Sequence, residues 1–180
     1  MEKLNVQTLT KDKNEFVSSI ITNSKGNVFL FKRKSTLRLD PGKYDFCSGH
    51  MKSYEIPMQS MIRELFEEIG VRYEQLKFMD KVADIETPHP KLKRTTTHLY
   101  YIVLDMPEEK INEMIKNVEE PELEEVIFLE NIDELKSKMI EEKDNFRMEY
   151  TDDMKMAINE VKKKINKRKQ QRREKECERK

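Results

Sequence analysis

The sequence predicts a single mixed α/β domain in which helices cover a mixed β-sheet. Short apolar segments rich in β-branched and aromatic residues are interspersed with amphipathic helical segments, without the strict βα alternation of a parallel sheet. A length of 180 residues is enough for one domain with a real core. No internal repeat and no glycine- or serine-rich linker divides the chain.

Three strands are predicted before residue 50. The first is Glu15–Thr22 (EFVSSIIT) and the second is 28–32 (VFLFK), and the turn signal NSKG between them predicts a hairpin. A basic loop at 34–43 separates this hairpin from a short strand at 44–48. That strand leads directly to Gly49.

The second half of the chain is expected to supply three more strands and three more helices. Asn131 is a plausible N-cap, and the acidic pair Asp152 and Asp153 suits the first turn of the last helix. Pro88 and Pro90 are expected to end the strand that precedes them. The predicted strands are 77–85, 95–104 and 125–129, and the predicted helices are 107–117, 132–142 and a final helix after residue 151.

A helix is predicted over Pro57–Ile69, with proline in its first turn and Gly70 at a left-handed C-terminal cap. At about 100° per residue, five apolar side chains fall on one stripe, which we expect to be buried. Three glutamates fall in an arc of similar width beside it, at spacings that bring their side chains together. The stripe consists of Met58, Met61, Ile62, Leu65 and Ile69, and the acidic arc consists of Glu64, Glu67 and Glu68.

Three carboxylates on one helical patch repel one another, and the repulsion grows as water is excluded. One interpretation is a solvated acidic face, which is common in a chain with 39% charged residues. The other is a divalent cation site, where an all-oxygen ligand set favours Mg²⁺ or Mn²⁺ over zinc. Such a metal ion can hold diphosphate oxygens and activate a water. Arg63, beside the cluster, is placed to hold a carboxylate by a charge-assisted hydrogen bond.

The surrounding spacing favours the metal site. Residues 49–71 read GHMKSYEIPMQSMIRELFEEIGV, from Gly49 to Val71, and match every fixed position of G-x5-E-x7-R-E-U-x-E-E-x-G-U, where U is a bulky aliphatic residue. This pattern resembles the Nudix box. The resemblance implies the α/β/α sandwich of the Nudix fold, with a mixed sheet and a loop–helix–loop that binds metal. It also implies hydrolysis of a phosphoanhydride bond in a nucleoside diphosphate linked to another moiety.

The resemblance also implies roles for individual residues. Glu67 and Glu68 would be the principal metal ligands, with Glu64 a further ligand or the general base. Gly49 would offer its carbonyl to the metal, and Arg63 would orient the catalytic glutamates. Glu55 would act in the loop, as an auxiliary ligand or structural acid on the substrate side. One more acid outside the box is expected, with four candidates: Glu120, Glu122, Glu124 and Glu125.

The segment FKRKSTLRLDPGKYDFCSGHMK is similar to isopentenyl diphosphate isomerases and their hydrolase relatives. Arg33, Lys34 and Arg38 would then contact substrate phosphates, although a solvated loop explains them equally well. The isomerase cysteine position is Ser48 here, and a one-residue shift in a strand turns Cys47 to the other face. A hydrolase is therefore favoured. The alternatives are an isomerase-like enzyme and a non-catalytic nucleotide- or RNA-binding Nudix module.

Composition favours a cytoplasmic protein. No apolar run approaches the length of a transmembrane helix, the first fifteen residues lack a signal-peptide core, and the two cysteines form no disulfide framework. We expect a Nudix domain at 1–160 and a basic helical tail at 161–180. Residues 162–180 carry 11 Lys or Arg and 3 Glu, a balance of +8. The tail is expected to be solvated, with RNA or an anionic surface as the alternative partner. A homodimer is one of the oligomeric states left open.

Overall fold

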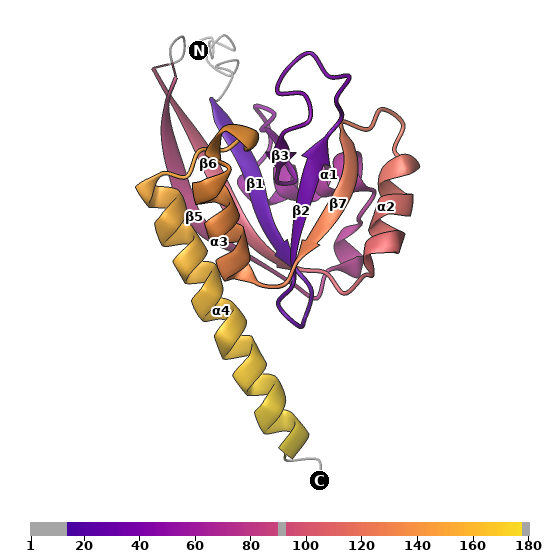
Figure 1. Ribbon diagram of the computed structural model, residues 1–180, viewed down its shortest axis with the longest axis vertical. Helices are drawn as coiled ribbons and strands as arrows, with labels where there is room; N and C mark the ends of the chain where they lie inside the picture. Colours follow the sequence, from indigo (N-terminus) through magenta and orange to yellow (C-terminus); the bar gives the residue numbers. More distant parts are fainter. Residues whose placement is uncertain (1–13, 90–92, 178–180) are drawn as a thin grey trace, which may run out of the picture.

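The computed structural model describes residues 14–89 and 93–177. Strands and helices are interspersed along the chain in the irregular order that the sequence predicts (Figure 1). In chain order the elements are β1 (Glu15–Thr22), β2 (Val28–Arg33), β3 (Tyr44–Asp45), β4 (Ser48–His50), α1 (Pro57–Ile69), η2 (Tyr73–Gln75), β5 (Phe78–His89), β6 (Lys93–Val103), α2 (Glu108–Lys116), β7 (Leu123–Leu129), α3 (Ile132–Glu141), η3 (Lys143–Asn145) and α4 (Asp152–Cys177).

The described strands form one mixed sheet. Its main path is β3-β2-β1-β6-β5, with β4 paired to β1 and β7 paired to β2. The β1–β6 pair is parallel over eight residues, whereas the other pairs are antiparallel. The predicted mixed α/β class is therefore confirmed. The antiparallel β1–β2 pair, joined at the turn where Gly26 has φ 96°, confirms the predicted hairpin.

Helices cover both faces of this sheet, which gives three layers. One hydrophobic cluster packs α3 and α4 against the sheet, and the other packs α1 and α2 on the opposite face. Alternate residues of β1 point to the two sides, so that Ile20 joins the first cluster while Val17 and Ile21 join the second. Figure 1 shows α3 and α4 in front of the sheet and α1 behind it. Because both faces are buried, the central strands carry nearly continuous apolar runs.

Helix α1 spans the predicted residues, and Gly70 ends it in the left-handed conformation with φ 69°. Its buried apolar side chains are Met61, Leu65 and Ile69. The predicted stripe is too wide, because Met58 is exposed and Ile62 is only partly buried. Met58 lies in the first turn of α1.

Two strand predictions need correction. The segment 44–48 divides into β3, which pairs with β2, and β4, which pairs with β1, so one expected strand serves two neighbours. Pro88 does not end its strand, because β5 continues to His89 and pairs Pro88 with Arg94. Strand β5 is the last in the sheet order, and an edge strand tolerates a residue without an N–H. Pro90 lies outside the described residues.

The last helix begins as predicted and continues far beyond the sheet. Asp152 and Asp153 occupy the first turn of α4, and Asn131 caps α3 by accepting from two backbone N–H groups. The first half of α4 packs on the core through Met154, Val161 and Ile165. Farther along, Arg172 donates to the carbonyl of Ser24 at 3.1 Å, and the C-terminal end projects past the edge of the body (Figure 1). Helix α4 is continuous across residue 160, and the division there into domain and tail stays a prediction. No helix among the described residues is long and apolar enough to cross a membrane.

Candidate active site

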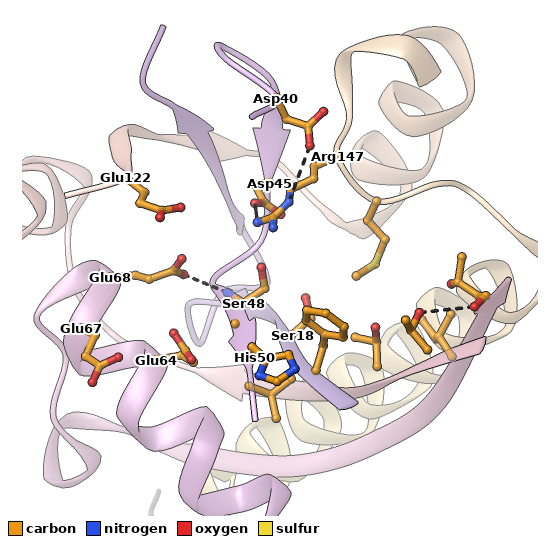
Figure 2. Close-up of a pocket in the computed structure, with 18 of the residues that line it drawn as sticks. Ser18, Asp40, Asp45, Ser48, His50, Glu64, Glu67, Glu68, Glu122 and Arg147 are labelled. Atoms are coloured by element: carbon orange, nitrogen blue, oxygen red, sulfur yellow. Dashed lines mark hydrogen bonds and ion pairs between the residues drawn. The ribbon is translucent and has the colours of Figure 1, made fainter. Parts of the chain in front are cut away.

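A cavity of about 910 Å³ opens over the second half of α1 and the loop that carries Gly49. Three sets of elements line it: the box with its loop, the ends of β1, β5 and β6, and two segments that are far apart in sequence (Figure 2). These distant segments are the approach to β7, with Glu120 and Glu122, and the linker before α4, with Arg147, Met148, Glu149 and Thr151. The cavity is therefore assembled from residues 16 to 151.

Arg63 is the centre of the hydrogen bonds within the box. Its Nε donates to Glu55 Oε1 at 2.7 Å, and its Nη1 donates to Glu64 Oε1 at 2.6 Å and to Glu67 Oε2 at 2.8 Å. Its Nη2 donates to the carbonyl of His50 at 3.0 Å, which ties the loop to the helix. One guanidinium therefore partly offsets the repulsion among three carboxylates.

Glu55 is buried and fully engaged. It accepts from both Arg63 Nε and Nη2, from the backbone N–H of Lys52 at 3.1 Å, and from the Ser60 hydroxyl. The hydrogen bonds from Arg63 are the largest cause that lowers the pKa of Glu55 to about 2. This placement makes Glu55 a structural acid of the loop, and its expected contact with substrate stays a prediction.

Gly49 faces the carboxylate of Glu64. A Cβ added at Gly49 would collide with Glu64 Cδ and both carboxylate oxygens, so only glycine lets this glutamate lie against the loop. Glu64 is buried, and burial is the main cause that raises its pKa. The loop and α1 therefore meet at Gly49 and Glu64, where the Glu64 carboxylate occupies the space that a Cβ at residue 49 would take.

Glu67 and Glu68 lie one turn beyond Glu64 on α1. Glu68 accepts from the backbone N–H of Ser48, the first residue of β4, at 2.8 Å. Burial, followed by the charge of Asp45, raises the pKa of Glu68 to about 8. Glu67 is half exposed and opens to the cavity. Figure 2 shows all three glutamates directed from α1 toward the strand that carries Ser48.

The side chains on this face of α1 belong to the chemical type that binds divalent cations. The donors are carboxylate oxygens with a nearby backbone carbonyl, which suit hard cations, and the missing Cβ of Gly49 lets the Glu64 carboxylate lie against that backbone. No three acidic, histidine or cysteine side chains of the described chain already converge in a metal-binding cluster. Glu64 and Glu67 each accept from Arg63 through one carboxylate oxygen, so each could offer its other oxygen to an ion while Arg63 keeps its contacts.

The predicted phosphate-binding cations are not among the residues that line the cavity. Arg33 is 3% exposed, and its guanidinium pairs with Asp45 at 3.3 Å and Glu122 at 3.1 Å. Lys34 and Arg38 belong to the loop after β2 and are not among the residues that line the cavity. A role for these three in substrate binding stays a prediction, and the burial of Arg33 favours a structural ion pair.

Of the four candidate acids outside the box, two reach the cavity. Glu120 and Glu122 line it from the approach to β7, while Glu124 and Glu125 lie on β7 itself and point elsewhere. Glu125 pairs with Lys32 at 3.6 Å. Glu122 is also the partner of Arg33, so Glu120 is the candidate without that competing ion pair.

Sequence reasoning missed Asp45 and Arg147. Asp45 is buried on β3, and Arg147 lies on the linker, yet Arg147 Nη1 donates to Asp45 Oδ2 at 2.9 Å. The two are separated by 102 residues. No local spacing indicates such a pair. The one signal available in the sequence was an acidic residue, Asp45, in the short predicted strand that leads into the box.

The comparisons with known proteins agree with the box and the fold. The NUDIX domain family model matches residues 14–150. An 8-oxo-dGTP diphosphatase of Proteus vulgaris is 32% identical over 75 residues, which is 42% of this chain and 66% of that protein. The chain therefore matches just under two thirds of that relative's length.

Solved structures show the same fold at low identity. An Ap4A hydrolase of C. elegans superposes with a TM-score of 0.57 and 15% identity, covering 84% of this chain and 97% of the other. The NUDIX domain of Shewanella oneidensis NrtR, solved with ADP ribose, gives 0.54 and 11%, covering 89% and 93%. Together with the family match over three quarters of the sequence, these findings identify the chain as a member of the Nudix family.

Proposed function

We propose that this protein is a divalent-metal-dependent hydrolase of a phosphoanhydride bond in a nucleoside diphosphate linked to another moiety. One observation carries the proposal: Glu64, Glu67 and Glu68 share one face of α1 beside Arg63 and line a single large cavity opposite Gly49. Nudix hydrolases in general use divalent metal ions. The combination matches what diphosphate cleavage requires, namely an anionic metal site beside space for a nucleotide.

Glu64, Glu67 and Glu68, with the Gly49 carbonyl, are the residues that would hold the metal ion, Mg²⁺ or Mn²⁺. When bound, such an ion polarises a phosphoryl oxygen and lowers the pKa of a water. Arg63 orients Glu64 and Glu67 through the hydrogen bonds from its Nη1. Without these hydrogen bonds, the Glu64 and Glu67 carboxylates would no longer be held together at one point.

Glu64 is the proposed general base. It lies buried against the loop, and burial raises its pKa, so its carboxylate is a stronger base than that of a solvent-exposed glutamate. Its carboxylate occupies the space beside Gly49 where a Cβ would otherwise lie, which holds it at the wall of the cavity. A water on the cavity side of Glu64 would donate its proton to Glu64 as the water oxygen attacks phosphorus, and the bond to the bridging oxygen would break. Two phosphorylated products result.

The cavity suits a nucleotide-sized substrate. Its volume of about 910 Å³ is near the upper end of the typical range for ligand sites, roughly 300–1,000 Å³. The names of the relatives specify 8-oxo-dGTP, Ap4A and ADP ribose, which are all nucleotides. They support a nucleoside diphosphate derivative as the substrate class.

No observation favours isomerase chemistry. Cys47 is fully buried in the core cluster below α1, and burial raises the pKa of its thiol well above the ordinary value. The residue that faces the cavity in its place is Ser48. A non-catalytic module is disfavoured because three carboxylates are kept together on one face at an electrostatic cost.

A hydrolysis screen tests the proposal. Purified protein with Mg²⁺ or Mn²⁺ is incubated with ADP-ribose, nucleotide sugars, a dinucleoside tetraphosphate, nucleoside triphosphates, coenzyme A and isopentenyl diphosphate. We expect cleavage of one class containing a substituted nucleoside diphosphate. Glu67→Gln should lower kcat by at least about a hundredfold, whereas Glu74→Gln, exposed and outside the cavity, should not. Proton exchange on isopentenyl diphosphate without hydrolysis would instead support the isomerase.

A further inference from the structure

The cavity contains far more acidic than basic side chains. Three cations line it, namely Lys52, Arg63 and Arg147, against eight carboxylates, counted over the described residues: Asp40, Asp45, Glu64, Glu67, Glu68, Glu120, Glu122 and Glu149. Arg63 is occupied by glutamates of the box. A diphosphate substrate therefore needs a further cation that still has N–H groups free to donate to a phosphate.

Arg147 has the geometry of such a cation. Its Nη1 donates to Asp45 Oδ2 at 2.9 Å, and its Nε is 3.9 Å from Asp40 Oδ2, which is too far for a hydrogen bond. No described side chain hydrogen-bonds the edge formed by Nε and Nη2. That edge of a guanidinium is the one that grips two oxygens of a phosphate in parallel. The side chain is 38% exposed, so a ligand can reach it.

The position of Arg147 is fixed before any ligand arrives. Its backbone N–H donates to the carbonyl of Tyr44 at 3.0 Å, and the neighbouring Phe146 ring packs on the Tyr44 ring with centroids 5.3 Å apart. Asp45, which holds its guanidinium, is itself held by Arg33 from the buried side. A preorganised cation loses little freedom on binding.

Arg147 also lies across the cavity from the glutamates of α1 (Figure 2). Figure 2 shows it on the opposite side from α1, with Asp45 beside it and Glu68 across the space. It is close enough to Glu68 and Glu122 for their charges to act on it. A group bound between α1 and Arg147 would therefore have one end at the metal face and the other at a guanidinium.

We propose that Arg147 is a substrate-binding residue that holds the phosphate next to the one at the carboxylate face, with Asp45 as its positioning residue. The inference rests on the proposed function and names the residue that would bind the second of the two adjacent phosphates in its substrate. It assigns to the linker before α4 a role that sequence reasoning gave to Arg33, Lys34 and Arg38.

The test compares Arg147→Gln with two matched controls. Arg33→Gln removes the other partner of Asp45 from the buried side, and Arg38→Gln removes an exposed arginine of the neighbouring loop. We expect Arg147→Gln to raise KM about tenfold to a hundredfold, as for a lost charged hydrogen-bond pair, with little change in kcat. Arg33→Gln should lower Tm and raise KM less than Arg147→Gln does, because Asp45 keeps its hydrogen bond from Arg147, and Arg38→Gln should change neither. Arg147→Lys should recover only part of the loss, because it keeps the charge without the fork.

Binding of α,β-methylene-ADP in the presence of Mg²⁺, followed by calorimetry, separates the two proposals. Weaker binding by Arg147→Gln in a protein that hydrolyses nothing would sink the proposed function while supporting the role of Arg147. Hydrolysis by wild type with unchanged KM and binding in Arg147→Gln and Arg147→Lys would overturn the role of Arg147. Loss confined to Lys52→Gln, or absence of binding by wild type, would overturn it as well.

Discussion

Arg63 and Glu55 are joined by two hydrogen bonds, Nε to Oε1 at 2.7 Å and Nη2 to Oε2 at 2.9 Å. This fork connects the loop after β4 to α1 across eight residues. Glu55 is 7% exposed, so the pair is shielded from solvent. It fixes the guanidinium that in turn orients Glu64 and Glu67.

Glu55→Gln should therefore destabilise the protein by about 2 kcal/mol at pH 7, the loss expected for a buried hydrogen-bonded charge pair. The folded-state pKa of Glu55, about 2, is below the ordinary value of 4.5. Its contribution is thus present above about pH 4.5 and is lost as pH falls toward 2. Urea unfolding at pH 7 and pH 3 should show a smaller gap between wild type and variant at pH 3. A gap that grows on acidification would contradict this assignment.

Gly49→Ala should damage activity more than stability. The added Cβ would collide with the Glu64 carboxylate, which can rotate away but only by leaving its position over the loop. We expect kcat/KM to fall about a hundredfold, as for a catalytic group displaced by about an ångström. Assays and thermal unfolding of the same preparation measure both effects.

Gly42→Ala is the matched control for that variant. Gly42 has φ 68° but nothing within 4 Å of an added Cβ. Left-handed strain should lower stability by about 1 kcal/mol, with kcat/KM retained. If both variants lost activity equally, the contact between Gly49 and Glu64 would not be the reason.

The charged end of α4 should have little influence on hydrolysis. Thr151 lines the cavity, but Arg173 lies about 33 Å farther along the helix at 1.5 Å per residue. Replacing Lys167, Lys169, Arg173 and Lys175 by glutamine should leave kcat/KM within about a factor of two at physiological salt, where charges are screened beyond about 8 Å. A large salt-dependent loss would show that the tail attracts the substrate.

The parts of the fold that the sequence predicts well are those specified by neighbouring residues. The run of apolar and β-branched residues in β1 that ends at a turn signal, the proline and glycine at the ends of α1 and the Asn131 cap are local signals. Pro88 was misjudged because its tolerance depends on β5 lying at the sheet edge. The same is true of the segment around Asp45, whose division between two strands depends on which neighbours it finds.

The candidate site likewise contains residues that local spacing predicts and residues that only the fold brings together. The box fixes Glu64, Glu67 and Glu68 on one helical face by spacing alone, and the structure brings Arg63 into contact with two of them. The cavity wall formed by Arg147 and Thr151 comes from a linker about a hundred residues later. Only the packing of α3 and α4 on the sheet brings that linker to the box, and no sequence spacing reports it.

The most direct test of the central claim is the metal dependence of hydrolysis. Chelator-treated wild type and Glu67→Gln are assayed on the best substrate from the screen while Mg²⁺ is added back. The account predicts no cleavage by treated wild type, recovery with Mg²⁺, and no recovery in Glu67→Gln at the same concentrations. Full activity in the presence of chelator, or equal recovery in both proteins, would contradict a metal site on the carboxylate face of α1.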